Sequence, residues 1–184
     1  MKKEEKECNH EIAPSLFYIF QKSLEQGIVP KAFKKAHITP IHKGGNQKEP
    51  KNFRPVALTS HLAKALEKLV LKELVKFLQL TGQMNPEQHG FRSGRSTTSQ
   101  LIQHMENIVE RLEQGDAVDV IYLDFAKAFD KVDHGILLRT LQKLGVRGSL
   151  GKWIYNFLTG RSQVVKVNGE ESDPTPVISG VPQA

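Results

Sequence analysis

Apolar residues recur at a helical spacing in four stretches of the chain, and each stretch runs into a glycine. The four stretches are Ile12–Gln26 before Gly27, Leu62–Leu80 before Gly82, Leu101–Gln114 before Gly115 and Ile136–Leu144 before Gly145. A period near 3.6 residues is typical of an amphipathic helix, and glycine readily takes the left-handed conformation that ends one. The pattern predicts four helices whose apolar stripes face a core, and a shorter helix around Trp153–Leu158. Thr97 and Gln100 fit a capping box at the start of the third helix.

Strands are predicted in three places. The run Val118–Leu123 is rich in β-branched and aromatic residues, which indicates a mostly buried strand. Gln163–Val167 precedes Asn168-Gly169, a dipeptide that favours the tight turn of a β-hairpin. His37–His42 is a weaker strand candidate. The stretches 43–55 and 82–96 are rich in Gly, Asn, Pro and basic residues and are predicted loops, so a mixed α and β fold is expected.

The composition is that of an ordinary globular protein, with 39% hydrophobic and 25% charged residues in a chain of 184. No apolar run approaches the roughly 18 residues that a membrane span needs, so no membrane partner is expected. Cys8 is the only cysteine, which excludes an intrachain disulfide and argues against a cysteine-based zinc site. An intracellular location, in the nucleus or the cytoplasm, is the expectation.

The net positive charge of the chain arises in one segment. Residues 22–54 hold eight Lys and Arg against two Glu, a surplus that equals the net charge of +6 of the whole chain. A local surplus of this kind suggests a site for a polyanion such as a nucleic acid. A solvated basic surface without a ligand is the alternative, and charge alone does not choose between them.

Asp124 is the clearest candidate for a metal-binding or catalytic residue. It directly follows the predicted strand, and a strand end holds a carboxylate rigidly at the rim of a sheet. Hard cations such as Mg²⁺ take one or two carboxylates together with phosphate oxygens of a substrate. A structural aspartate that caps the next turn is the alternative. Asp130 and Asp133 lie beyond the turn and are expected to orient the backbone or to cap the helix near His134, and the seven histidines show no ligand-type spacing.

Three kinds of chemistry use an aspartate at the end of a strand. A phosphatase of the haloacid dehalogenase type needs a second aspartate two residues on, where this chain has Ala126. A receiver domain needs an acidic pair after an earlier strand, and none is present. A nucleotidyl transferase with two metal ions needs a further carboxylate from elsewhere in the sheet. The third fits best, because other segments support it.

Six short sequence words, taken together, resemble the reverse transcriptase of non-LTR (LINE-type) retrotransposons, near the jockey-like group. In chain order they are Gly27–Pro30, Pro40–Gly44, Asn52–Leu58, Gln88–Thr97, Leu123–His134 and Ser179–Gln183. One such word would be weak, whereas six in the right order make chance improbable. The resemblance runs from about Ile12 to Gln183 and implies an RNA template, a DNA primer and deoxynucleoside triphosphates (dNTPs) as partners.

The resemblance implies roles for three residues of the aspartate segment. Asp124 looks like the first metal-binding aspartate of the polymerase palm, and the backbone carbonyl of Phe125 could complete that coordination. Two Mg²⁺ ions would stabilise charge on the triphosphate and activate the primer 3′-hydroxyl. Phe129 stands where related polymerases place a ring under the nucleotide sugar, which excludes a 2′-hydroxyl. A core aromatic is the alternative for Phe129.

Five further residues receive binding roles from the same resemblance. Arg54 matches the position at which the fingers contact the triphosphate, for which a planar guanidinium is suited. Lys43 is a second phosphate ligand, and Gln183 matches the glutamine that contacts the incoming nucleotide. Arg92 and Arg95 are candidates for the template or primer backbone, with plain surface arginines as the alternative.

The implied fold is α+β, with the fingers and part of the palm of a right-hand polymerase. Residues 1–11 are expected to be a flexible charged start, 12–115 the fingers and helical part, and 116–184 a partial palm that stops before the paired-aspartate motif and the thumb. We expect this chain by itself to be catalytically inactive, because one palm aspartate leaves the metal site incomplete. We also expect it to be only marginally stable, because a palm sheet without its central hairpin has an open edge and an uncovered apolar face. The competing hypotheses are a non-catalytic nucleic-acid-binding remnant of a mobile element and a scaffold without a ligand.

Overall fold

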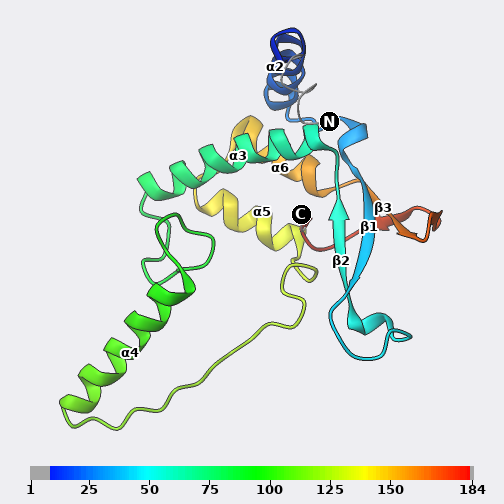
Figure 1. The fold of residues 1–184 in the computed structure, drawn as a ribbon. Helices are drawn as coiled ribbons and strands as arrows, with labels where there is room; N and C mark the ends of the chain where they lie inside the picture. The colour runs from blue at the N-terminus through cyan, green and yellow to red at the C-terminus, as the bar shows by residue number, and fades with distance from the viewer. Residues whose placement is uncertain (1–8, 183–184) are drawn as a thin grey trace. The chain divides into compact units, whose positions relative to one another are not determined.

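The computed structural model describes residues 9–182 (Figure 1). Cys8 and Gln183 lie outside the described residues, and so does most of the predicted flexible start, residues 1–11. The chain forms two compact units. The larger takes in the chain up to Lys72 and again from Lys127 onward, and the smaller spans Glu73–Ala126. The predicted division into fingers (12–115) and partial palm (116–184) does not coincide with these two units, and it stays a prediction.

All five predicted helices are confirmed. They are α2 (Asn9–Gln26), α3 (His61–Leu80), α4 (Thr97–Glu113), α5 (His134–Lys143) and α6 (Gly148–Leu158). The glycines after the four periodic stretches all have positive φ, between 66° and 95°, as a left-handed cap requires. The start of α4 differs from the prediction, because Ser96 and Ser99 form the capping box in place of Thr97 and Gln100. Ser96, one residue before Thr97, has an extended backbone, and its short side chain accepts a hydrogen bond from the N–H of Ser99, the N3 residue.

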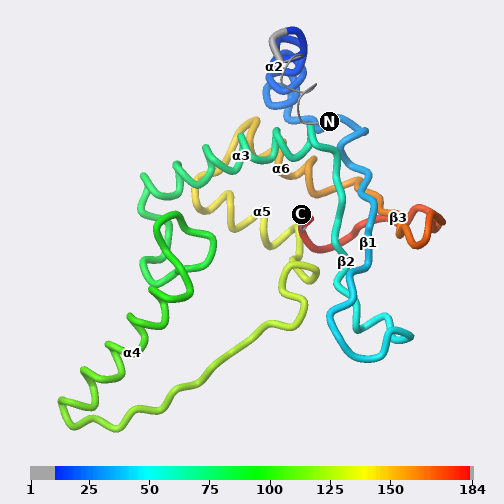
Figure 2. Tube along the Cα trace, in the orientation of Figure 1, coloured from blue at the N-terminus to red at the C-terminus, as the bar shows by residue number. Residues whose placement is uncertain are grey.

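Five strands form one sheet in the larger unit: β1 (Lys35–His42), β2 (Phe53–Leu58), β3 (Arg161–Val167), β4 (Glu170–Glu171) and β5 (Thr175–Val177). The order is β2-β1-β3-β4, with β5 also paired to β3; β1 and β3 run parallel, and the other pairs are antiparallel. Figure 2 lets the reader follow β1 and β2 side by side, joined by a loop that contains the short helix Pro50–Asn52. Asn168 and Gly169 both have positive φ, which confirms the predicted hairpin turn between β3 and β4.

The loop prediction for 43–55 is wrong at its end, because β2 already begins at Phe53. Pro55 and Arg54 obscure the strand in the sequence, since proline cannot donate to a sheet ladder. On the outer edge of the sheet one side of the strand needs no partner, so Pro55 is tolerated there, opposite Pro40 of β1. The loop prediction for 82–96 is confirmed: those residues form turns only.

The predicted strand Val118–Leu123 is wrong for the described residues. The segment carries no strand assignment, and Ile121, Tyr122 and Leu123 are between 80% and 85% exposed. A strand exists only when a second strand shares its hydrogen bonds. All five described strands lie in the larger unit, whereas this run belongs to the smaller one. Asp124 therefore does not lie at the rim of a described sheet.

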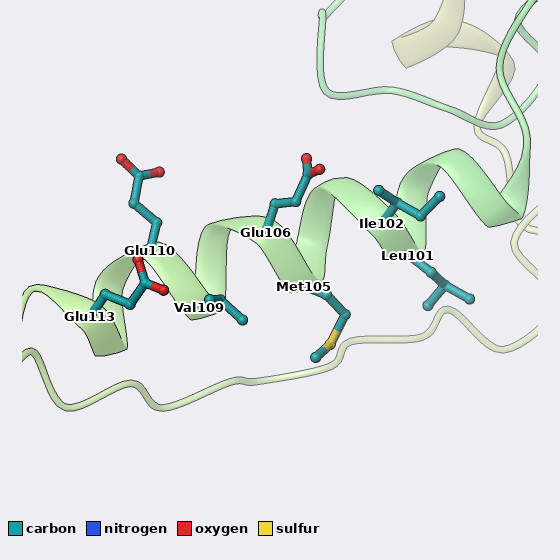
Figure 3. A pocket seen from close by; sticks show the side chains of 7 residues that line it. All are labelled: Leu101, Ile102, Met105, Glu106, Val109, Glu110 and Glu113. Carbon is teal, nitrogen blue, oxygen red and sulfur yellow. The ribbon is translucent and has the colours of Figure 1, made fainter.

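The helices differ in how far their apolar stripes are buried. In the larger unit Leu66, Trp153 and Leu158 are at most 3% exposed. In the smaller unit the stripe of α4 has no buried residue, so the prediction that it faces a core is wrong for the described residues. Leu101, Met105 and Val109 project from one side of α4, away from Glu106 and Glu110 (Figure 3). An amphipathic pattern fixes which side of a helix is apolar and leaves open what covers it.

No helix within residues 9–182 has the length and apolar character to cross a bilayer.

Candidate functional site

The second half of the aspartate segment folds onto the segment that leads to Gln183. The Val181 N–H donates to the carbonyl oxygen of Phe129 at 3.0 Å, and the Gly180 N–H donates to Val132 at 2.9 Å. The Ser179 hydroxyl donates to the carbonyl of Asp130 at 3.2 Å. We call the joined segments 129–134 and 179–181 the latch. Two sequence words that the resemblance assigns to the nucleotide site are thereby brought together within the larger unit.

Gly180 is what permits the close approach in the latch. Its φ is +81°, and a Cβ placed there would lie 2.8 Å from the carbonyl oxygen of Asp130. A side chain at this position would both clash with the opposite segment and strain the backbone. The closeness of the two segments therefore depends on glycine.

Asp133 caps α5, as predicted. Its carboxylate accepts a hydrogen bond from the Ile136 N–H at 2.7 Å, which satisfies one of the free donors of the first turn. The cap fixes where α5 begins, and so places His134 as its first residue. The ring Nε2 of His134 lies 2.7 Å from the carbonyl oxygen of Gly180. Sequence reasoning treated this histidine as incidental, because no local pattern marks a contact 46 residues away.

Asp124 and Phe125 lie in the extended segment of the smaller unit, and both are exposed. Within residues 9–182 no group of three or more His, Cys, Asp or Glu side chains is arranged to hold a metal ion. Asp124 is an accessible carboxylate, which can supply a ligand to a cation and does not build a site by itself.

Lys43 and Arg54 lie next to the two ends of the β1–β2 connection, and both are exposed. The Lys43 N–H donates to the carbonyl of Asn52 at 2.9 Å, which extends the pairing of the two strands by one step. Arg54 stands opposite Ile41 in the antiparallel register. Both predicted phosphate ligands are therefore carried on a paired hairpin with their charges open to solvent.

A cleft of about 420 Å³ lies on one face of the sheet in the larger unit. Its lining includes Ile38, Pro55, Gln163, Asp130 and the segment 176–182. Successive side chains of a strand point to opposite faces, so Arg54 projects from the face opposite to Pro55. Arg54 therefore projects away from this cleft.

Arg161 lines the same cleft and is only 5% exposed, although it carries a charge. Its Nη1 donates to the carbonyl of Phe157 at 3.2 Å, and its guanidinium lies 4.8 Å from the centre of the Phe157 ring. Phe157 stands near the C-terminus of α6, where the helix dipole favours a cation. Burial lowers the pKa of Arg161, and the negative charge of Glu67 opposes that shift. We interpret Arg161 as a structural residue that holds β3 against α6.

Glu67 on α3 gives a prediction about pH. Burial raises the pKa of this carboxyl above its usual 4.5, and the nearby charges of Arg161 and Lys64 only partly oppose the shift. The folded state then holds the proton more tightly than the unfolded state. The free energy of unfolding is therefore expected to fall as the pH rises from about 4.5 through the raised pKa.

The measurement is urea unfolding of the wild type and of Glu67→Gln at several pH values from about 4 upward. Glu67→Gln, which cannot titrate, should remove this decline. Glu73→Gln, at an exposed position of the same helix, should retain it. Identical pH profiles for wild type and Glu67→Gln would contradict the prediction.

Arg92 and Arg95 take part in the internal bonding of their loop. Arg92 donates to the carbonyl of Asn85 at 2.8 Å. The Nη1 of Arg95 lies 3.0 Å from Nε2 of His89, whose Nδ1 lies 3.1 Å from the carbonyl of Glu87. A neutral His89 with its proton on Nδ1 satisfies both contacts. Neither arginine is committed to a carboxylate in these contacts, so the predicted role in backbone binding stays a prediction.

Comparison with known proteins decides the family. Residues 41–183 match the family described as reverse transcriptase (RNA-dependent DNA polymerase). This chain belongs to the reverse transcriptase family. The predicted resemblance is thereby confirmed, and the match includes the hairpin β1–β2 from Ile41 onward, the aspartate segment and the latch.

Three relatives illustrate the match. The chain is 34% identical to the RNA-directed DNA polymerase from mobile element jockey and 31% identical to a probable RNA-directed DNA polymerase from transposon BS, both of Drosophila melanogaster and both over 91% of this chain. It is 30% identical over 89% of its length to the Pol polyprotein of the type-1 retrotransposable element R2 of Popillia japonica. The matched region covers 18%, 18% and 22% of these relatives respectively, so this reverse transcriptase chain spans about a fifth of their length.

Proposed function

We propose that this chain carries the nucleotide-facing part of an RNA-directed DNA polymerase, which extends a DNA primer with dNTPs on an RNA template. The observation that carries the proposal is the latch, because it joins the segment of Phe129 to the segment that leads to Gln183. The family gives these two segments to one nucleotide. Their contact within a single compact unit is what such a shared site requires.

Each proposed contact has a physical reason. Arg54 and Lys43 would bind the triphosphate, since both are exposed cations on a paired hairpin and charge-assisted bonds to phosphate are strong. For Arg54 the proposal requires the triphosphate to reach the face of the hairpin opposite to the cleft. Arg92 and Arg95 would contact the sugar-phosphate backbone of template or primer. Gln183, which lies outside the described residues, would contact the incoming nucleotide. The ring of Phe129 would lie under the sugar and exclude a 2′-hydroxyl by contact.

The role of Phe129 is tested by substitution. In a polymerase assembled from the full-length protein, Phe129→Ala should lower the preference for dNTP over ribonucleotide about tenfold or more, because the steric barrier is removed. The measurement is incorporation of each nucleotide in single-turnover extension. Phe129→Tyr keeps the bulk of the ring and should keep the preference. An unchanged preference in Phe129→Ala would assign the ring to packing.

Magnesium is the metal that the family implies, and the described residues do not fit a complete site for it. Asp124, with the carbonyl of Phe125, would supply part of a ligand set, and within residues 9–182 it belongs to no group of three or more potential side-chain ligands. The sequence contains no adjacent pair of aspartates. We therefore propose that the 184-residue chain does not catalyse extension by itself, and that two-metal chemistry belongs to a longer protein.

Primer extension tests this proposal. Oligo-dT annealed to poly-rA is incubated with the chain, Mg²⁺ and labelled dTTP, and the expected result is no incorporation above a protein-free blank. Template-dependent incorporation that Asp124→Ala abolishes would refute the proposed inactivity. A separate reaction, with retroviral reverse transcriptase in place of the chain, serves as the positive control.

A non-catalytic nucleic-acid-binding remnant is the second candidate, and the charge surplus of residues 22–54 favours it. Binding by counterion release falls steeply with salt and needs no nucleotide. Steeply salt-dependent binding of RNA without any effect of dNTP would support the remnant. Binding of dNTP that requires Mg²⁺ would support retained polymerase geometry, and weak binding to every nucleic acid would support a scaffold.

A further inference from the structure

We propose that His134 is a positioning residue of the nucleotide site, and that it acts through the carbonyl of Gly180 to hold the segment before Gln183 against the segment of Phe129. The functional consequence of the inference rests on the proposed function, and its geometry rests on hydrogen bonds within the larger unit. None of the roles considered above includes this histidine.

The contact itself is short and well placed. Nε2 of His134 lies 2.7 Å from the carbonyl oxygen of Gly180, and the ring is half-buried. A carbonyl oxygen can only accept, so Nε2 carries the proton and donates. His134 is the first residue of α5, and its backbone is fixed by the Asp133 cap. The donor therefore projects from the ordered end of a helix.

His134 is the latch residue that belongs to a helix. Every acceptor in the latch is a backbone carbonyl, and the donors are the N–H groups of Val181 and Gly180, the Ser179 hydroxyl and the ring of His134. The first three donors join two loop segments to each other, whereas His134 joins the segment 179–181 to the first turn of α5.

The geometry of Gly180 makes this residue the pivot of the latch. Its N–H donates to Val132 and its carbonyl accepts from His134, so both polar groups of one buried residue are bonded. Gln183 follows only three residues later in the sequence. Fixing both groups of Gly180 fixes the backbone of the segment 179–181. Losing the histidine bond frees the Gly180 carbonyl and lets this segment move.

The experiment compares His134→Ala and His134→Gln in the full chain. Binding of dTTP in the presence of Mg²⁺ is measured by titration, and exchange of the Gly180 and Val181 amides is measured by NMR. We expect His134→Ala to weaken dTTP binding about five- to tenfold and to speed exchange of both amides, as loss of one hydrogen bond predicts. His134→Gln retains an N–H donor and should recover most of both effects. A melting temperature close to that of the wild type would show that the change is local.

Two further variants keep the test decisive. His104→Ala removes a histidine whose Nε2 lies 3.0 Å from the hydroxyl of Tyr122 in the smaller unit, and it should leave dTTP binding unchanged. If His134→Ala fails to fold, His134→Leu, which has no N–H donor, takes its place: faster Gly180 exchange in His134→Leu than in His134→Gln supports the role of the histidine, and equal exchange in the two variants overturns it.

Failure of the inference can be told apart from failure of the proposed function. If the wild type does not bind dTTP, the proposed function fails. The exchange rates of the Gly180 and Val181 amides then decide by themselves whether His134 holds the segment 179–181. If the wild type binds dTTP and His134→Ala changes neither affinity nor exchange, the positioning role is overturned. Equal losses in His134→Ala and His134→Gln, with a lowered melting temperature in both, would reduce the histidine to a structural residue and would also overturn it.

Discussion

Replacing Trp153 with alanine is expected to lower the free energy of unfolding by about 3–5 kcal/mol. The indole is only 3% exposed and stacks on Phe157 with the ring centres 5.4 Å apart. Its Nε1–H donates to the buried Ser23 hydroxyl at 2.9 Å, which ties α6 to α2. The substitution removes the apolar contacts, opens a cavity and breaks this bond. For a domain whose whole stability is about 5–15 kcal/mol, that loss is large.

Urea unfolding followed by circular dichroism measures the effect. Tyr155→Ala is the matched control, since Tyr155 lies on the same helix and is 54% exposed, and its change should stay within about 1 kcal/mol. Trp153→Phe keeps much of the ring volume and should cost less than the alanine variant. Equal midpoints for Trp153→Ala and Tyr155→Ala would show that α6 does not organise the core of the larger unit.

Asp124→Ala is expected to abolish Mg²⁺-dependent binding of dNTP to the chain, with a loss of affinity of more than about tenfold. The carboxylate is the candidate metal ligand of the aspartate segment. Because it is exposed and outside any described core, its removal should leave the folded structure intact. The expected result is thus a loss of binding without a loss of stability, which separates a ligand from a structural aspartate.

Isothermal titration of dTTP with and without Mg²⁺ provides the measurement. Asp119→Ala is the matched control, because Asp119 is an exposed aspartate of the same extended segment, and it should bind as the wild type does. Equal affinities for wild type and Asp124→Ala would remove Asp124 from the proposed site. A similar loss in both variants would indicate a general effect of charge.

Helices and turns were the part of this fold that local sequence predicts well. A glycine ends a helix because of its own backbone freedom, and Gly27 and Gly145 do so here. Asn168-Gly169 makes its turn for the same local reason. The start of α4 was misplaced by one residue, since Ser96 and Thr97 are both acceptable caps and only the backbone at Ser96 decides between them.

The candidate site was predicted in its residues and not in its connections. Arg54, Phe129 and Asp124 follow from sequence words, because the family match is a property of sequence. The words do not show that Arg54 projects from the face opposite to the cleft, which follows from the register of β2 on β1. They also did not reveal His134 or Arg161, whose contacts join residues of different elements.

The amino-acid order by itself determined the membership in the reverse transcriptase family, the helices, their glycine ends and the hairpin turn. Only the tertiary structure decided that Val118–Leu123 is unpaired among the described residues and that segments 129–134 and 179–181 meet. The reason is physical. A helix satisfies its hydrogen bonds within itself, whereas a strand or a latch needs a partner from elsewhere in the chain, and that partner is not written in the local pattern.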